Sequence, residues 1–163
     1  MKLQMMKAAT ACAAALSLWA CGEEAAPESA PLEENADNLD CGGPSTAERY
    51  HDGITKTSES GRFSVTILTS DPAPPIKGDN TIELLVTEGE APVAGREITV
   101  SPFMPHHNHG TAPADYVGVS SEDGVINIPS FFIFMPGYWE YTVTIQGEDG
   151  VEDQAVFAFC VEG

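Results

Sequence analysis

The sequence predicts an all-β fold built as an antiparallel sandwich, and three observations carry this prediction. Apolar and polar residues alternate with a period of two in short runs from residue 62 onward, as they do in strands that bury one face. Gly, Pro, Asn and Asp gather between these runs and indicate turns. No run in this part of the chain shows helical periodicity between capping residues.

The alternation divides this region into seven short strands, each with one apolar face. In chain order the expected strands are 62–67, 81–87, 96–100, 116–119, 125–128, 138–145 and 154–161. The run 138–145 is the clearest, because its alternate residues from Trp139 to Ile145 are all apolar. About seven such strands are typical of an immunoglobulin-like sandwich, and a closed barrel is the structural alternative. We expect the aromatic residues of 131–139 to lie in the core.

The first twenty residues indicate an export signal and not part of the fold. Two lysines precede an apolar stretch from Ala8 to Ala20, which is too short to cross a bilayer as a permanent helix and has the length of a signal-peptide core. The ending Leu18-Trp19-Ala20-Cys21 resembles a bacterial lipoprotein signal, which is cleaved before the cysteine. The alternative is an ordinary signal peptide followed by a coincidental cysteine.

The lipoprotein resemblance implies that acyl chains on Cys21 anchor the protein to a lipid bilayer. Because Gly22 and not Asp follows the cysteine, lipoprotein sorting implies the outer membrane of a two-membrane cell, on its periplasmic or surface side. Residues 22–40 hold seven acids, no base and no aromatic residue, so they cannot bury enough surface to fold. We therefore expect a signal peptide at 1–20, an acidic disordered tether at 21–47 and one domain at 48–163.

The charge of the chain restricts its partners. The 163 residues carry a formal net charge of −18, with 7 Lys and Arg against 25 Asp and Glu. Both nucleic acids and anionic lipid surfaces repel such a protein, so we expect no nucleic-acid partner. The acidic tether could instead collect metal ions, although carboxylates alone discriminate poorly between metals.

Four cysteines remain to be assigned. Cys12 lies in the signal peptide and Cys21 carries the lipid, which leaves Cys41 and Cys160 at the two ends of the domain. An exported protein meets oxidising conditions, so we expect a Cys41–Cys160 disulfide. The alternative is a thiol pair that serves metal binding or redox chemistry.

One cluster of residues has the composition of a metal site. Three of the four histidines, His106, His107 and His109, lie within four residues and follow Met104. Imidazole nitrogen and thioether sulfur are ligands that suit copper. In an extended chain Met104 and His106 would share one face and His107 and His109 the other, and a turn at 108–110 would let the two sets converge.

A second methionine completes the expected ligand set. Met135 precedes the strand 138–145, and the loops at one end of a sandwich cluster together. We therefore predict a copper site with His106, His107 and His109 as primary ligands and with Met104 and Met135 as auxiliary ligands. The alternatives are that both methionines only fill the core and that the histidines form a polar loop. We expect the fourth histidine, His51, to lie on the surface.

Two motifs resemble a known family. The run Met104-Pro105-His106-His107-Asn108-His109-Gly110, followed by the Phe-x-Phe-Met-x-Gly-x-Trp run at 132–139, is similar to the YtkA-like family, which is related to FixH-like proteins. The resemblance implies an immunoglobulin-like domain in an exported or membrane-tethered protein, often in the context of copper or other metal handling.

The sequence therefore predicts a membrane-anchored lipoprotein that handles copper, with a metal-handling protein as a partner. The alternative is an immunoglobulin-like interaction module that is not catalytic and binds no metal. We expect no enzymatic activity, because no nucleophile elbow, metalloprotease motif or phosphate-binding glycine loop is present in the sequence.

Overall fold

The computed structural model describes residues 38–41 and 46–163. The predicted signal peptide, Cys21 and most of the predicted tether lie outside these residues. All regular secondary structure in the described part is β-strand. No helix that could cross a membrane is found there.

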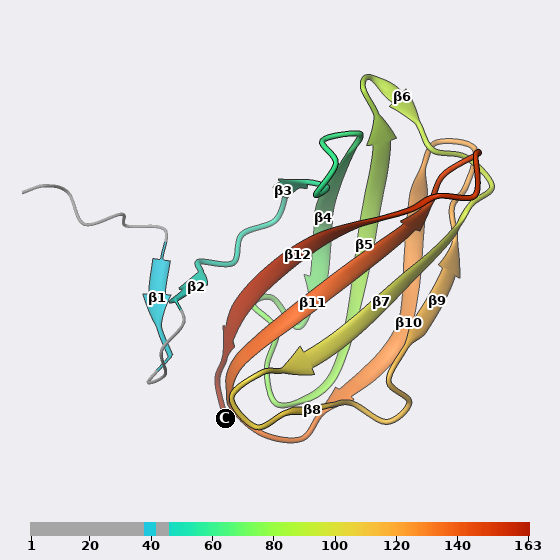
Figure 1. Ribbon diagram of the computed structural model, residues 1–163. Coiled ribbons are helices and arrows are strands. Elements are labelled where there is room, and N and C mark those ends of the chain that lie inside the picture. Colours follow the sequence, from blue (N-terminus) through green and yellow to red (C-terminus); the bar gives the residue numbers. More distant parts are fainter. Residues whose placement is uncertain (1–37, 42–45) are drawn as a thin grey trace, which may run out of the picture. The chain divides into compact units, whose positions relative to one another are not determined.

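Twelve strands are present in the described residues (Figure 1). They are β1 (Asn38–Asp40), β2 (Thr46–Glu48), β3 (Ile54–Thr57), β4 (Phe63–Asp71), β5 (Gly78–Glu88), β6 (Ala91–Pro92), β7 (Glu97–Met104), β8 (His109–Gly110), β9 (Tyr116–Val119), β10 (Val125–Ile133), β11 (Gly137–Gln146) and β12 (Glu152–Val161).

The strands form two sheets (Figure 1). The first has the order β1-β2-β12-β11-β7-β8, and β9 also pairs with β7. The second has the order β10-β5-β4-β3, and β6 pairs with β5. The named strands pair antiparallel except at the single contact between β2 and β12. Apolar residues from both sheets form one core, so the predicted all-β antiparallel sandwich is confirmed.

The core follows the alternation in the sequence. Trp139, Tyr141, Val143 and Ile145 of β11 are fully buried, as predicted. The expectation for the aromatic run was wrong at Phe132 and Phe134, whose exposed fractions are 48% and 40%. Because successive side chains of a strand point to opposite faces, burial of Phe131 and Ile133 in β10 turns Phe132 outward.

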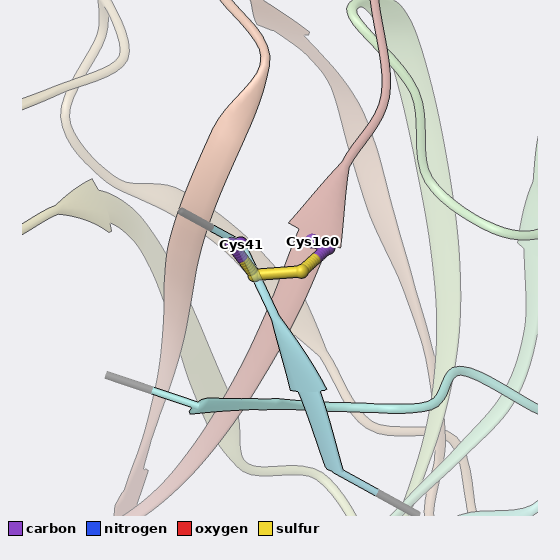
Figure 2. Close-up of a disulfide and its surroundings, with 2 residues drawn as sticks. All are labelled: Cys41 and Cys160. Atoms are coloured by element: carbon purple, nitrogen blue, oxygen red, sulfur yellow. A yellow bond between two sulfur atoms is a disulfide. The ribbon is translucent and has the colours of Figure 1, made fainter. Parts of the chain in front are cut away.

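A disulfide joins Cys41 to Cys160, as predicted, and links the segment after β1 to β12 (Figure 2). The two Cα atoms are 5.5 Å apart and the cysteines are 119 residues apart in sequence. Residues 38–40 belong to the segment assigned to the tether, and in the structure they pair with β2. The disulfide therefore ties this N-terminal segment to the last strand of the sandwich.

Asp153 connects the turn between β3 and β4 to β12. The backbone N–H of Ser60 donates to Oδ1 of Asp153 at 3.2 Å, and the Ser60 hydroxyl donates to Oδ2 at 2.5 Å. Burial alone would raise the pKa of this carboxyl group, but hydrogen bonds from Ser58, Ser60 and the backbone of Gln154 outweigh it and lower the pKa to about 2. The charged form of Asp153 is therefore the one that the fold stabilises.

We expect Asp153→Asn to lower the free energy of unfolding at pH 7 by about 2 kcal/mol, the scale of hydrogen bonds to a charged group. The folded pKa lies below the unfolded value of about 3.9, so the carboxylate stabilises the fold above pH 4 and loses this effect as the pH falls toward 2. Urea unfolding of wild type and variant at several pH values measures the difference, with Glu152→Gln as the control. A difference that stays constant down to pH 2 would contradict the assignment.

Candidate metal centre

The histidine tract forms a tight hairpin between β7 and β8. The backbone N–H of His107 donates to the carbonyl of Met104 at 3.1 Å, and that of Asn108 donates to the carbonyl of Pro105 at 3.2 Å. Asn108 has a φ of 54°, a left-handed conformation that asparagine tolerates. The chain thus turns at 105–108, before the turn at 108–110 that would let the two sets of side chains converge. Pro105 favours the second position of a turn, which explains why the chain reverses direction before residue 108.

This hairpin places a methionine beside a histidine. Met104 and His109 are directly opposite each other in the β7–β8 ladder, so their side chains leave the sheet on the same face. Met104 is buried, with an exposed fraction of 2%, whereas His109 is half-buried. The Met104 side chain therefore belongs to the core, and its cross-strand neighbour His109 lies at the edge of that core.

His109 lies among aromatic rings. Its ring centroid is 5.5 Å from that of Phe134, 5.8 Å from that of Trp139 and 5.8 Å from that of His107. Its Nδ1 is 3.3 Å from the carbonyl oxygen of Gly110. In the tautomer that donates this bond, the lone pair is on Nε2, which is the atom that can bind a metal.

The β10–β11 loop, which carries Met135, reaches the same end of the sandwich (Figure 1). Phe134 and Trp139, which both contact His109, flank this methionine in the chain. The indole Nε1–H of Trp139 donates to the carbonyl of Met135 at 3.1 Å and fixes the loop. Met135 is half-buried and packs against the core.

His106 contacts a different aromatic residue from those that surround His109. Its exposed ring stacks on Tyr138, with centroids 5.1 Å apart and an angle of 18° between the planes. Tyr138 and Trp139 are neighbours in β11 and point to opposite faces, so His106 and His109 contact opposite sides of this strand. Within the described residues, no three His, Cys, Asp or Glu side chains are grouped to hold a metal ion.

His51 lies apart from the histidine tract, whereas Gly137 lies beside it. His51 is exposed, as expected, and its Nδ1 lies 3.1 Å from the carbonyl of Asp52. Gly137, the first residue of β11, lies against Met104: a Cβ atom on this glycine would be 2.5 Å from the Met104 methyl carbon. Gly137, Phe134 and Trp139 were not among the predicted site residues, although all three belong to the motif at 132–139.

The YtkA-like family matches residues 57–144. The chain belongs to the YtkA-like family. This match confirms the resemblance inferred from the two motifs, and it includes Met104, the three histidines and Met135. Comparisons with curated proteins and with solved structures found no match.

The β7–β8 hairpin and the β10–β11 loop together form one tip of this YtkA-like domain. This tip offers two kinds of ligand atom. Imidazole nitrogen comes from the adjacent His107 and His109, and thioether sulfur comes from Met104, opposite His109 in the ladder, and from Met135 in the neighbouring loop. The disulfide lies close by, since Cys160 is opposite Tyr138 in the β11–β12 ladder, but its two cysteines offer no free thiol as a ligand. Nitrogen and thioether ligands together favour copper over the hard cations.

Proposed function

We propose that this YtkA-like protein binds copper at the β7–β8 tip and acts in metal handling as a lipoprotein anchored in the cell envelope. The observation that carries the proposal is the pairing of His109 with the buried Met104, beside His107 and the Met135 loop. A soft sulfur ligand and an imidazole are thereby next to each other on one face of the hairpin.

The separation of the two adjacent imidazoles suits a shared ion. Metal–nitrogen bonds of about 2 Å, plus about 1 Å from each nitrogen to its ring centre, place two ligating rings up to about 6 Å apart. The centroids of His107 and His109 are 5.8 Å apart, a separation within the range of two ligands of one ion. His106 joins this set only when its ring leaves Tyr138.

The proposed location rests on the N-terminal sequence. The Leu-Trp-Ala-Cys run at 18–21 supports cleavage before Cys21, lipidation of this residue and insertion into a lipid bilayer, with the outer membrane as the destination. The Cys41–Cys160 disulfide supports an oxidising compartment. A protein of metal handling is the proposed partner, to which the copper ion passes or from which it comes.

Copper titration of the mature chain tests the proposal. Cys21→Ser keeps this chain free of lipid and removes a competing thiol. Trp139 is the only tryptophan after the signal peptide and contacts His109, so its fluorescence reports binding. We expect His107→Ala with His109→Ala to weaken Cu(I) binding by about 100-fold or more, because even the hydrogen-bond partners of ligands contribute about 10–100-fold.

Two controls sharpen this experiment. His51→Ala removes an exposed histidine outside the tip and should leave the affinity unchanged. Affinity should fall in acidic solution, because protons compete with the metal for the ligand atoms. If a variant with His106, His107 and His109 all replaced by alanine bound copper as tightly as wild type, the site would be refuted.

That outcome would leave the second candidate function, an interaction module without metal. The observation that favours it is the exposure of Phe132 and Phe134 near the tip, because exposed aromatic residues are common in protein interfaces. Binding of a membrane protein that is unaffected by chelators would support this alternative.

A further inference from the structure

We infer that Gly137 is a positioning residue of the proposed copper site: the missing side chain leaves space for the end of the Met104 side chain, the cross-strand neighbour of His109, and this arrangement makes the site selective for Cu(I). The inference rests on the proposed function and adds a specificity determinant to it.

The contact between Gly137 and Met104 is unusually specific. A Cβ atom built on Gly137 would lie 2.5 Å from Cε of Met104, and it would have no other heavy atom within 4 Å apart from its own chain neighbours. The Cβ atom of an alanine at this position would therefore meet the end of the Met104 side chain alone. Because that end is flexible, the thioether would move and the strands would stay in place.

Movement of the thioether matters because of the ladder register. Met104 is directly opposite His109 in the β7–β8 ladder, so a change in the position of its side chain acts on the neighbour of that imidazole. Cu(I) favours thioether sulfur, whereas Cu(II) is held well by imidazole nitrogen alone. Displacing the sulfur should therefore weaken the binding of Cu(I) far more than the binding of Cu(II).

A second glycine, Gly78, provides a control for the backbone strain that alanine would cause at Gly137. Gly137 begins β11 with a φ of +131°, and Gly78 begins β5 with a φ of +125°. Alanine is strained at both positions, but a Cβ atom on Gly78 would meet no heavy atom within 4 Å. Gly78→Ala thus reproduces the strain without the contact to Met104.

The experiment compares Gly137→Ala, Gly78→Ala and Met104→Leu in the mature chain that carries Cys21→Ser. Cu(I) and Cu(II) affinities are measured by competition with chelators of known affinity, and stability is measured by urea unfolding. We expect Gly137→Ala to weaken Cu(I) binding by about tenfold, a typical effect of a residue that orients a ligand, with little change for Cu(II). Gly78→Ala should lose similar stability and keep both affinities.

A double variant shows whether Gly137 acts through the thioether. If it does, Gly137→Ala should have no further effect on Cu(I) affinity once Met104→Leu has removed the sulfur, because the two changes then act on one interaction. Equal Cu(I) affinities of Gly137→Ala and Gly78→Ala, or an unchanged affinity of Met104→Leu, would overturn the inference and leave the copper site intact. Absence of Cu(I) binding by the wild-type chain would instead refute the proposed function, and the inference with it.

Discussion

Replacing both Cys41 and Cys160 by alanine should lower the free energy of unfolding by about 4 kcal/mol, within the range found for disulfides that close long loops. The cysteines are 119 residues apart, so the bond encloses β2 through most of β12 and restricts almost the whole unfolded domain. The stabilisation arises mainly because the unfolded chain loses conformational entropy.

Urea unfolding followed by Trp139 fluorescence measures this effect in the mature chain. The reduced wild-type protein is the natural control, because it should unfold at the same urea concentration as the double alanine variant. A single Cys41→Ala variant should give the same loss, since either change opens the loop. Equal unfolding midpoints for oxidised and reduced wild type would show that the bond contributes nothing to stability.

The long strands could be predicted from the sequence because their burial is one-sided. In β4, Phe63, Val65 and Ile67 alternate with polar residues and are all buried, so the pattern contains enough positions to be recognised. The strands β6 and β8 have two residues each, which is too few for any periodicity. Pairing with a longer neighbour determines these short strands, and single-sequence periodicity does not record such pairing.

The disulfide could be predicted from cysteine count and export alone, because only two cysteines remained after the signal and the lipid anchor were assigned. The arrangement of the histidines could not. It depends on where the chain reverses after Met104, and the left-handed Asn108 and the β7–β8 register decide this. A shift of this pairing by one residue would move His109 from the face of Met104 to the opposite face of the sheet.

The same reasoning explains why Gly137 and Trp139 were missed as site residues. Both belong to the motif at 132–139, but neither has a metal ligand in its side chain, so ligand chemistry alone does not identify them. Gly137 contributes the absence of a Cβ atom next to Met104, and Trp139 contributes a hydrogen bond and a ring surface. Such roles become visible only when the β7–β8 hairpin and the β10–β11 loop are placed together.

Trp139→Ala should lower the free energy of unfolding by about 4 kcal/mol, as is typical for the loss of a large aromatic residue from a core. The indole is fully buried, contacts His109 and Phe134, and donates a hydrogen bond to the carbonyl of Met135. Its removal therefore leaves a cavity beneath the tip and releases the loop that carries the second methionine.

Trp139→Phe separates these two contributions. Phenylalanine retains an aromatic ring against His109 but cannot donate to the Met135 carbonyl, so about 1 kcal/mol should be lost with the hydrogen bond, in addition to the effect of the smaller ring. Because both variants lack the fluorescent residue, circular dichroism in urea is the appropriate measurement. If Trp139→Ala unfolded at the same urea concentration as wild type, the indole could not be the residue that holds the β7–β8 hairpin and the β10–β11 loop together.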